Sequence, residues 1–524
     1  MTLSLAEQLY MRHAWWLVVL FLFVMQWPFL QADPLVALSH SRDAFTDEGL
    51  NTSQVRNWAN HGDWNFWECD NLIKNPLFNA LLALPFKVFG TSWLTARLTV
   101  LFSVLCLLLY AGSINPMRSV MPVFVVIVFT QFHAFHYSHF SMAEMVAVAA
   151  VIAAIASWVW YATHPSEIKR NRWLWVSLLF ATAAWWLKVQ FAYLVFLIPV
   201  STLLLWLFSA HHRKRGKNLL FSSLLLMAAA GLTVLIYILV WYLPNREAWL
   251  YIMHDQASGR FPHWKYLGVI GKFNFLQYFN QPAVLPLFFS FILSVPVCFW
   301  LLVKQKKPAF QTLIIISAVW VLLEMHKIFI HHVPGRYLVS AFVSMGLFAV
   351  LVWSEFFRRM FLQYHHPDVK NKRTAQWWMY FSAVLLLTLF YNQGISYNRS
   401  LKERTYVIHE ISSYIQRSLP DHSVALGAWS PSLTWGTKIR AVPVWNEFLN
   451  YKNILETFRP RIIFSETEEQ DSNGAFSADG IILTELADSV KNYTVGKWPV
   501  NLYWINSEKM NQMIQHRKTI HEKL

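Results

Sequence analysis

The chain has 524 residues, of which 56% are hydrophobic, 17% aromatic and only 14% charged, and its formal net charge at pH 7 is +15. A soluble globular protein has about a quarter of its residues charged and a smaller hydrophobic share, so this class is excluded. The composition indicates a polytopic membrane protein, and the positive charge is expected mainly in cytoplasmic loops.

Eleven apolar segments of about the length that crosses a bilayer follow one another along the chain. They are 14–31, 93–111, 119–136, 143–161, 173–188, 190–209, 219–243, 283–303, 309–325, 337–354 and 375–391. The first is predicted to be a retained signal anchor, because no small-residue cleavage site follows it. The apolar run 77–89 is too short to span and is predicted to form an interfacial helix.

Lysine and arginine concentrate in four loops, 167–172, 211–217, 304–307 and 358–373. Alternating the loops puts all four on the side of the N-terminus, which the positive-inside rule makes the cytoplasm. The opposite side receives the acid-rich loop 32–92, the loop 244–282 and everything from residue 392. We expect no nucleic-acid partner, because the basic residues lie in short separate loops rather than on one folded face.

The apolar spans stop near residue 391, and charged residues then become frequent. A helix is predicted over 404–419 and strands over 423–427, 461–465 and 480–484. The expected fold is therefore mainly α, with a membrane domain at 1–391 and a small extracytoplasmic α/β domain at 392–524. The cysteines Cys69, Cys106 and Cys298 suggest no disulfide framework.

Ionisable residues gather at the boundary of the spans on the non-cytoplasmic side. Asp47 and Glu48 follow the first span, and Glu144 begins the fourth. The other members are Lys74, Arg97, His133, His136, His139, Lys188, His254, Asp255, Arg260, His263, Lys327, His331, His332 and Arg336. Carboxylates near lipid cost several kcal/mol unless they are paired or functional. The pattern predicts one active site at this boundary, with Asp47 and Glu48 at its centre.

This mixture of side chains suits group transfer from a donor that carries a phosphate. A carboxylate can accept the proton of an attacking hydroxyl or amine, while Lys, Arg and His stabilise the charge on a departing phosphate. Nucleotide sugars and ATP are not supplied outside the cytoplasm. A lipid-linked donor is therefore favoured.

Several motifs resemble those of GT-C glycosyltransferases, especially the bacterial branch of protein O-mannosyltransferases and the lipid A aminoarabinose transferase. The first outer loop carries Asp47-Glu48, Gly62-Asp63-Trp64, Lys74-Asn75-Pro76 and Ala96-Arg97-Leu98. Later motifs extend the resemblance to about residue 390, namely Glu144, Trp186-Leu187-Lys188, Ser258-Gly259-Arg260-Phe261 with His263, and His331 to Leu338. The resemblance implies an inverting transfer of a sugar from a polyprenyl phosphate to a lipid, glycan or protein acceptor at the outer face of a bacterial inner membrane.

The resemblance also implies roles for individual residues. Asp47 would be the general base or would position the acceptor, Glu48 would support it, and Glu144 stands where the family has a second acid. The residues implied to contact the donor phosphate are Lys74, Arg260, His263, His331 and Arg336, with Arg97 and Lys188 in support. The family's Glu-Lys-Pro, whose Glu helps to hold a metal, is Lys74-Asn75-Pro76 here. A divalent metal ion therefore stays an open cofactor, and Lys74 is an alternative source of positive charge.

Other interpretations compete with these. Asp47 and Glu48 would be simple caps if a helix began near Gly49. The spacing of His133, His136 and His139 would suit a metal but is more typical of interface packing. At the level of function, the alternatives are a transporter or flippase for a lipid-linked glycan, a scaffold, and a polysaccharide polymerase that takes a prenyl diphosphate donor.

Overall fold

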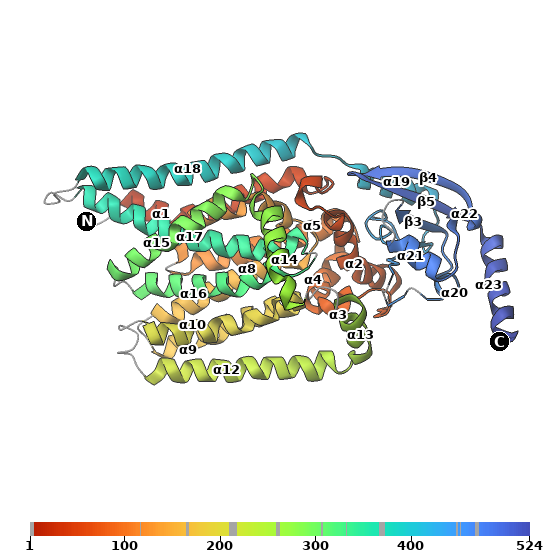
Figure 1. Ribbon diagram of the computed structural model, residues 1–524, viewed down its shortest axis with the longest axis horizontal. Helices are drawn as coiled ribbons and strands as arrows, with labels where there is room; N and C mark the ends of the chain where they lie inside the picture. Colours follow the sequence, from red (N-terminus) through yellow and green to blue (C-terminus); the bar gives the residue numbers. More distant parts are fainter. Residues whose placement is uncertain are drawn as a thin grey trace.

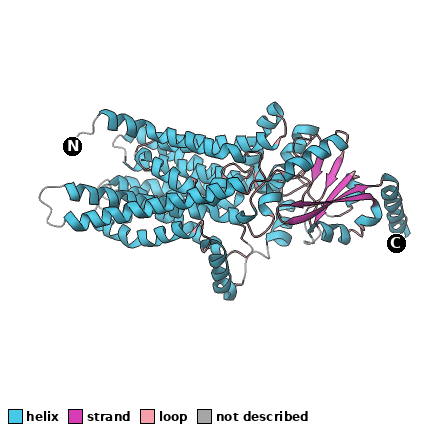
Figure 2. Cartoon of the chain, turned by 90° about the horizontal axis from the view of Figure 1, so that it is seen from above, coloured by secondary structure: helices cyan, strands magenta, loops and turns pink. Residues whose placement is uncertain are grey.

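The computed structural model describes residues 5–523 except 116, 164–166, 209–216, 258–262, 305–307, 332, 366–371, 447–448, 451 and 467–470. A bundle of long helices forms one end of an elongated molecule, and a smaller domain with a β-sheet forms the other (Figures 1 and 2). Helix α1 begins at the end of the bundle that lies farthest from this sheet (Figure 1).

Seven helical segments of the described chain are long and apolar enough to cross a membrane. They are α5 (Trp93–Ser113), α8 (Ala143–Thr163), η5 and α10 (Val189–Phe196 and Leu197–Phe208), α12 and η6 (Lys217–Tyr237 and Ile238–Tyr242), α15 (Leu285–Lys304), α16 and η11 (Pro308–Glu324 and Met325–Phe329) and α17 (Gly335–His365). The most apolar window of α8 is 94% buried and that of α17 is 89% buried, so these two helices form the centre of the bundle. The prediction of an integral membrane protein is confirmed.

The other four predicted spans are also helical, in different forms. Three are the long helices α1 (Leu5–Gln26), α9 (Glu167–Leu187) and α18 (Lys372–Lys402). The fourth, predicted at 119–136, is divided into η3 (Met117–Ser119), α6 (Met121–Phe124), η4 (Val125–Phe129) and α7 (Phe132–Tyr137). The break before α7 falls at Gln131, whose side chain accepts a hydrogen bond from the Ala134 N–H and caps a new helix. The number of membrane crossings stays a prediction.

Short helices form at the end of the first predicted span and in the loops that were predicted to lie outside the cytoplasm. They are η1 (Trp27–Phe29), η2 (Val36–Leu38), α2 (Asp43–His61), α3 (Asn71–Lys74), α4 (Pro76–Phe89), α13 (Arg246–Tyr251), η7 (Ile252–Ala257), η9 (Trp264–Tyr266), α14 (Leu267–Asn274) and η10 (Phe275–Phe279). Helix α4 confirms the short helix predicted at 77–89. Because α2 begins at Asp43, the alternative that Asp47 and Glu48 are helix caps is wrong: both lie in the second turn.

The domain beyond the bundle is built on a mixed sheet. Within the described residues its five strands have the order β2-β1-β3-β5-β4, in which β1 is parallel to β2 and β3, and β5 is antiparallel to β3 and β4. The elements are α19 (Val407–Ser418), β1 (Val424–Leu426), β2 (Arg440–Val442), α20 (Ile454–Phe458), β3 (Ile462–Glu466), α21 (Asp471–Ala478), α22 (Leu483–Leu486), β4 (Ala487–Val495), β5 (Trp498–Ile505) and α23 (Ser507–Lys523). The predicted small C-terminal α/β domain is thus present.

The predictions for single elements of this domain differ in outcome. Helix α19 and strands β1 and β3 were predicted correctly, but the strand predicted at 480–484 is wrong. The chain turns at Gly480, which has φ +64°, and then enters α22. Burial of Ile481 and Leu483 with Ile482 exposed imitates the alternation of a strand over three residues only. At the other border, α18 runs past residue 391 to Lys402, so the long helix leads directly into the α/β domain.

Helix α2 lies between the bundle and the α/β domain, beside α3 and α4 (Figure 1). It is rich in polar residues and yet buried from Asp43 to Asn57, so its polar groups need partners on several sides. The Arg56 guanidinium donates to the carbonyl oxygens of Pro431 (2.5 Å) and Thr434 (2.8 Å). The Ser432 hydroxyl donates to the Thr46 carbonyl (3.0 Å). These bonds attach α2 directly to the α/β domain.

Gly49 lets α2 approach the domain this closely. A Cβ atom at this position would lie 2.4 Å from the Ser432 backbone N and 2.6 Å from the Pro431 carbonyl carbon, which is backbone that cannot rotate away. We expect Gly49→Ala to destabilise the folded protein by about 1–3 kcal/mol, as overpacking does elsewhere. Thermal unfolding in detergent measures the effect. Gly231→Ala on α12 is the matched control, because a Cβ there meets nothing within 4 Å; equal unfolding temperatures for the two variants would contradict the prediction.

Candidate active site

The acidic face of α2 meets Arg336 at the beginning of α17. Asp43 and Asp47 are four residues apart and therefore lie on one face of the helix. The Asp43 Oδ2 atom lies 2.9 Å from Arg336 Nη1, and the Asp47 carboxylate also forms an ion pair with that nitrogen. The side chains of Asp43, Asp47 and Arg336 are only 10–12% exposed, so water screens the charges weakly.

The segment before α17 sets the place of Arg336. A Cβ on Gly335 would lie 2.9 Å from the Leu38 carbonyl oxygen, so this position accommodates glycine alone without a shift of the backbone. The Tyr278 hydroxyl donates to the Val333 carbonyl (2.7 Å) and fixes the same segment from η10. The segment from Val333 to Arg336, which belongs to a motif noted in the sequence, is therefore held in place by backbone packing as well as by charge.

Glu144 and Lys188 complete the group. Glu144 lies in the first turn of α8 and is 1% exposed. Its Oε1 atom lies 3.3 Å from Arg336 Nε and 3.3 Å from Lys188 Nζ, and Lys188 stands between α9 and η5. We call Asp43, Asp47, Glu144, Lys188 and Arg336 the Arg336 cluster. Its three carboxylates and two cations leave one surplus negative charge when all are ionised.

The environment of Asp47 suits a base that works near neutral pH. Burial disfavours its charged form and raises the pKa of the carboxyl from 3.8 to about 6. The Arg336 charge opposes this rise, and the Asp43 carboxylate adds to it. A carboxylate with this pKa is mostly ionised at pH 7 and can still accept a proton effectively.

Glu48 points away from this cluster, because neighbouring residues of a helix are separated by about 100°. Its carboxylate accepts a bond from Arg97 Nε (2.9 Å) and pairs with Arg97 through a second nitrogen. The Ser141 N–H (2.7 Å) and hydroxyl (3.1 Å) donate to the same carboxylate. The structure thus divides the predicted catalytic pair: Asp47 lies with Arg336, Glu144 and Lys188, and Glu48 lies with Arg97.

The remaining predicted phosphate ligands lie at other places. Lys74 forms an ion pair with Asp70 one helical turn earlier in the chain. His263 is exposed at the start of η9, and His331 is exposed in the turn before α17. Arg260 falls outside the described residues. Their contact with a donor stays a prediction.

Asp43 is the member of the cluster that the sequence analysis did not select. The signal was its spacing of four residues from Asp47, which places both carboxylates on one helical face only if the helix begins before Asp47. A helix was expected to begin near Gly49, so this signal was not used.

The carboxylates of the cluster do not offer a ready metal site. Within the described part of the chain, no three His, Cys, Asp or Glu side chains are grouped as metal ligands. Asp43, Asp47 and Glu144 instead share the Arg336 guanidinium, which stands where a shared cation would bind.

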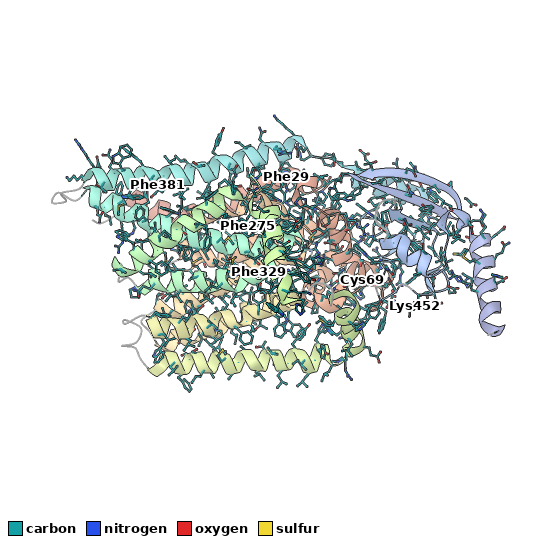
Figure 3. The ribbon with its side chains drawn as sticks, in the orientation of Figure 1. Phe29, Cys69, Phe275, Phe329, Phe381 and Lys452 are labelled. Carbon is teal, nitrogen blue, oxygen red and sulfur yellow. The ribbon has the colours of Figure 1, made fainter. Side chains whose placement is uncertain are left out.

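The three histidines with metal-like spacing bind three different segments. The side chains of His133 and His136 make hydrogen bonds with Gln281 Oε1 (2.9 Å) and Ser400 Oγ (3.0 Å), and His139 is hydrogen-bonded to Gln26. They link α7 and the turn after it to α1, α18 and the residues before α15. The side chain of Phe29, labelled in Figure 3 near the junction of the bundle and the α/β domain, packs edge-on against His136.

A bundle of apolar helices followed by a small domain with a β-sheet is a fold that this chain shares with solved structures of other proteins, which confirms the expected fold. Two crystal structures of ArnT from Cupriavidus metallidurans are similar at 14% identity and cover 93% of this chain and 97% of their own. Their TM-scores are 0.52 for the form bound to undecaprenyl phosphate and 0.54 for the apo form. An oligosaccharyltransferase from Archaeoglobus fulgidus, in complex with Zn and sulfate, has a TM-score of 0.53 at 10% identity, covering 91% of this chain and 72% of its own. No protein-family model and no curated protein matches the sequence.

Proposed function

We propose that this chain is an integral membrane glycosyltransferase that moves a sugar from a polyprenyl phosphate to an envelope lipid, glycan or protein. The observation that carries the proposal is the Arg336 cluster, a buried set of carboxylates and cations at the end of the bundle that meets the α/β domain. The fold shared with ArnT bound to undecaprenyl phosphate supports a polyprenyl donor. In this proposal the protein lies in a bacterial inner membrane, with the α/β domain outside the cytoplasm.

The reaction is a single inverting displacement at the anomeric carbon. The acceptor oxygen or nitrogen attacks this carbon and gives its proton to the Asp47 carboxylate. The bond between the anomeric carbon and the phosphate oxygen breaks, and its electron pair leaves with the polyprenyl phosphate. The products are the glycosylated acceptor and polyprenyl phosphate, and the proton on Asp47 returns to water.

Arg336 and Lys188 supply the positive charge that the leaving phosphate needs. Both are held by carboxylates in the structure, with Lys188 Nζ 3.3 Å from Glu144 Oε1. A guanidinium can bind phosphate through two parallel hydrogen bonds, so Arg336 can exchange a carboxylate for a phosphate oxygen as the donor enters. Lys74, Arg260, His263 and His331 are proposed as further phosphate contacts. Arg97 and Glu48 are proposed to position α2, and not to touch the donor.

Transfer in a purified system tests the proposal. The full-length protein in lipid nanodiscs is supplied with radiolabelled polyprenyl-phosphate sugars and with an envelope extract as the source of acceptors. Label that moves from the lipid to an acceptor supports a transferase. Donor that binds and crosses the bilayer of a vesicle without chemical change would overturn the proposal in favour of a flippase.

Activity is expected to rise with pH around the pKa of Asp47. The base must be ionised, and burial sets this pKa to about 6, so the rate at pH 5 should be about a tenth of the rate at pH 8. Initial rates across this pH range measure the midpoint. Because the Asp43 charge raises the pKa of Asp47, Asp43→Asn should move the midpoint to lower pH. If Asp43→Asn does not move the midpoint of the pH profile, a group other than Asp47 titrates.

A further inference from the structure

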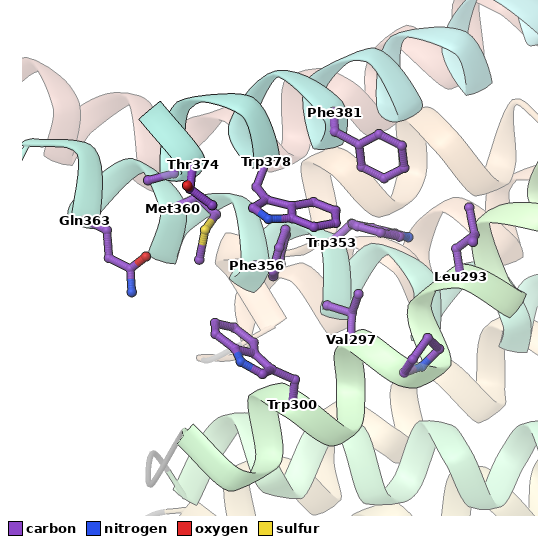
Figure 4. A pocket seen from close by; sticks show the side chains of 12 residues that line it. Leu293, Val297, Trp300, Trp353, Phe356, Met360, Gln363, Thr374, Trp378 and Phe381 are labelled. Atoms are coloured by element: carbon purple, nitrogen blue, oxygen red, sulfur yellow. The ribbon is translucent and has the colours of Figure 1, made fainter. Parts of the chain in front are cut away.

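A cavity of about 880 Å³ lies between α15, α17 and α18 (Figure 4). This volume is typical of ligand sites, which range over about 300–1,000 Å³. Its walls include Trp300, Trp353, Phe356 and Trp378. Helix α17 carries Arg336 at one end and Phe356 20 residues later, so the cavity is about 30 Å from the Arg336 cluster at 1.5 Å per residue. The proposed transfer reaction gives it no role.

The aromatic wall is held together without a ligand. The Phe356 ring packs against Trp300, Trp353 and Trp378, with ring centroids 5.6, 5.8 and 5.7 Å away. The Trp353 indole N–H donates to the Ser290 carbonyl (3.1 Å) and ties α17 to α15. A proline within a helix removes a backbone donor, and Pro296, which lies inside α15, lines the cavity. The cavity is therefore a preformed feature of the bundle.

The cavity is open toward the outside of the bundle. Trp300 is 38% exposed and Trp378 is 44% exposed, although both belong to long helices of the membrane domain. Figure 1 shows α18 along one edge of the bundle, and the most apolar window of α15 is only 28% buried. Side chains in this position face lipid when the protein is in a membrane. An apolar, aromatic cavity that opens to lipid suits an alkyl chain.

One end of the cavity is polar, and basic residues lie next to it in the chain. Gln363 and Thr374 line it there, and Lys372 and Arg373 directly precede Thr374 at the start of α18. On α17, Arg358 and Arg359 both pair with Glu355, and neither lines the cavity. Lys372 and Arg373 are therefore the two cations next in the chain to the polar end of the cavity, and both are exposed. In the topology predicted from loop charges, this end lies at the cytoplasmic surface.

We propose that the cavity binds an anionic glycerophospholipid of the cytoplasmic leaflet. Its acyl chain occupies the aromatic cavity, and its phosphate lies among Lys372, Arg373 and the polar end formed by Gln363 and Thr374. Basic sites between membrane helices on the cytoplasmic side attract anionic lipid headgroups in this way. A zwitterionic lipid of the same chain length fits the cavity equally well but gains less from the cations.

Native mass spectrometry of the full-length protein in detergent tests this proposal. The probes are phosphatidylglycerol and phosphatidylcholine with identical acyl chains, and the first is expected to bind about tenfold more tightly. The double variant Lys372→Gln/Arg373→Gln should remove this preference. The matched control is Arg399→Gln/Lys402→Gln, which makes the same charge change at the other end of α18 and should leave the preference intact. Ala375→Trp, which places an indole in the cavity, should weaken the binding of both lipids.

Equal affinity of the wild-type protein for the two lipids would overturn the proposal, and so would equal losses in the two double variants. Displacement of phosphatidylglycerol by undecaprenyl phosphate at equal concentration would reassign the cavity to an isoprenoid chain. Lys372 and Arg373 are exposed, so their substitution leaves folding intact even if Ala375→Trp does not fold. The measurement contains no sugar donor, so its result is independent of whether the chain is a glycosyltransferase.

Discussion

Asp47→Asn is expected to reduce sugar transfer by about 10²–10⁴-fold, the usual contribution of a general base. Asparagine has nearly the same shape and can still contact Arg336, but it cannot accept a proton. Binding of the donor should persist, because removing one carboxylate beside Arg336 leaves more positive charge for the phosphate. Initial rates of transfer and a direct donor-binding assay on the same preparation separate these two effects.

Asp43→Asn is the matched control for this variant. Asp43 lies one helical turn earlier, is buried to the same extent and pairs with the same nitrogen of Arg336. The substitution makes the same change in charge, so a general effect of charge on Arg336 would lower both rates equally. A base at Asp47 predicts that Asp43→Asn keeps most of the activity at pH 8. Equal losses would assign both carboxylates to the positioning of Arg336.

Charge patterns in the sequence predicted the large-scale fold because they reflect membrane physics. Apolar runs must be helical within lipid, and basic loops stay on one side. Three of the predicted cytoplasmic loops adjoin helices α10, α12, α15, α17 and α18. The ends of these helices next to the loops lie, as expected, at the end of the bundle opposite the α/β domain (Figure 1). The sequence could not show where helices break, since the division near Gln131 depends on a local cap.

The hairpin formed by β4 and β5 was not predicted from the sequence, for a different reason. Strand β4 is exposed at nearly all of its inner positions, so its residues lack the alternation of a half-buried strand. It pairs with β5 at the edge of the sheet, where polar residues are tolerated. Lys491 of β4 lies over the Tyr414 ring at 3.9 Å, a contact between distant segments that no local pattern predicts.

The division of Asp47 from Glu48 was also beyond the sequence. Adjacent carboxylates suggested one functional pair, but a helix turns them toward different neighbours. Glu48 meets Arg97, 49 positions away, whereas the face with Asp43 and Asp47 meets Arg336, which is 293 positions from Asp43. Which arginine each acid meets is decided by how α2 packs against α5 and α17.

Arg97→Met is expected to lower the stability of the folded protein by about 3–5 kcal/mol, the effect of leaving a buried charge without its partner. Arg97 is fully buried, and its guanidinium also donates to the carbonyl oxygens of Phe29 (2.8 Å) and Ala32 (2.7 Å). It stacks over the Trp93 ring at 3.9 Å. One side chain therefore joins α5, α2 and the segment after α1, and thermal unfolding in detergent should show the loss.

Glu48→Gln then decides whether this ion pair positions α2 or takes part in the chemistry. A glutamine keeps the shape of the side chain and its bonds from Ser141, but it leaves the Arg97 charge without a carboxylate, so it should also lower stability. If Glu48 is a positioning residue, the activity that remains should follow the fraction of protein that stays folded, and the pH profile should keep its midpoint. A loss of transfer as large as that of Asp47→Asn, at an unchanged unfolding temperature, would instead place Glu48 beside the reacting atoms. The double variant Glu48→Leu/Arg97→Leu should be more stable than Arg97→Met, because an apolar pair leaves no buried charge unpaired.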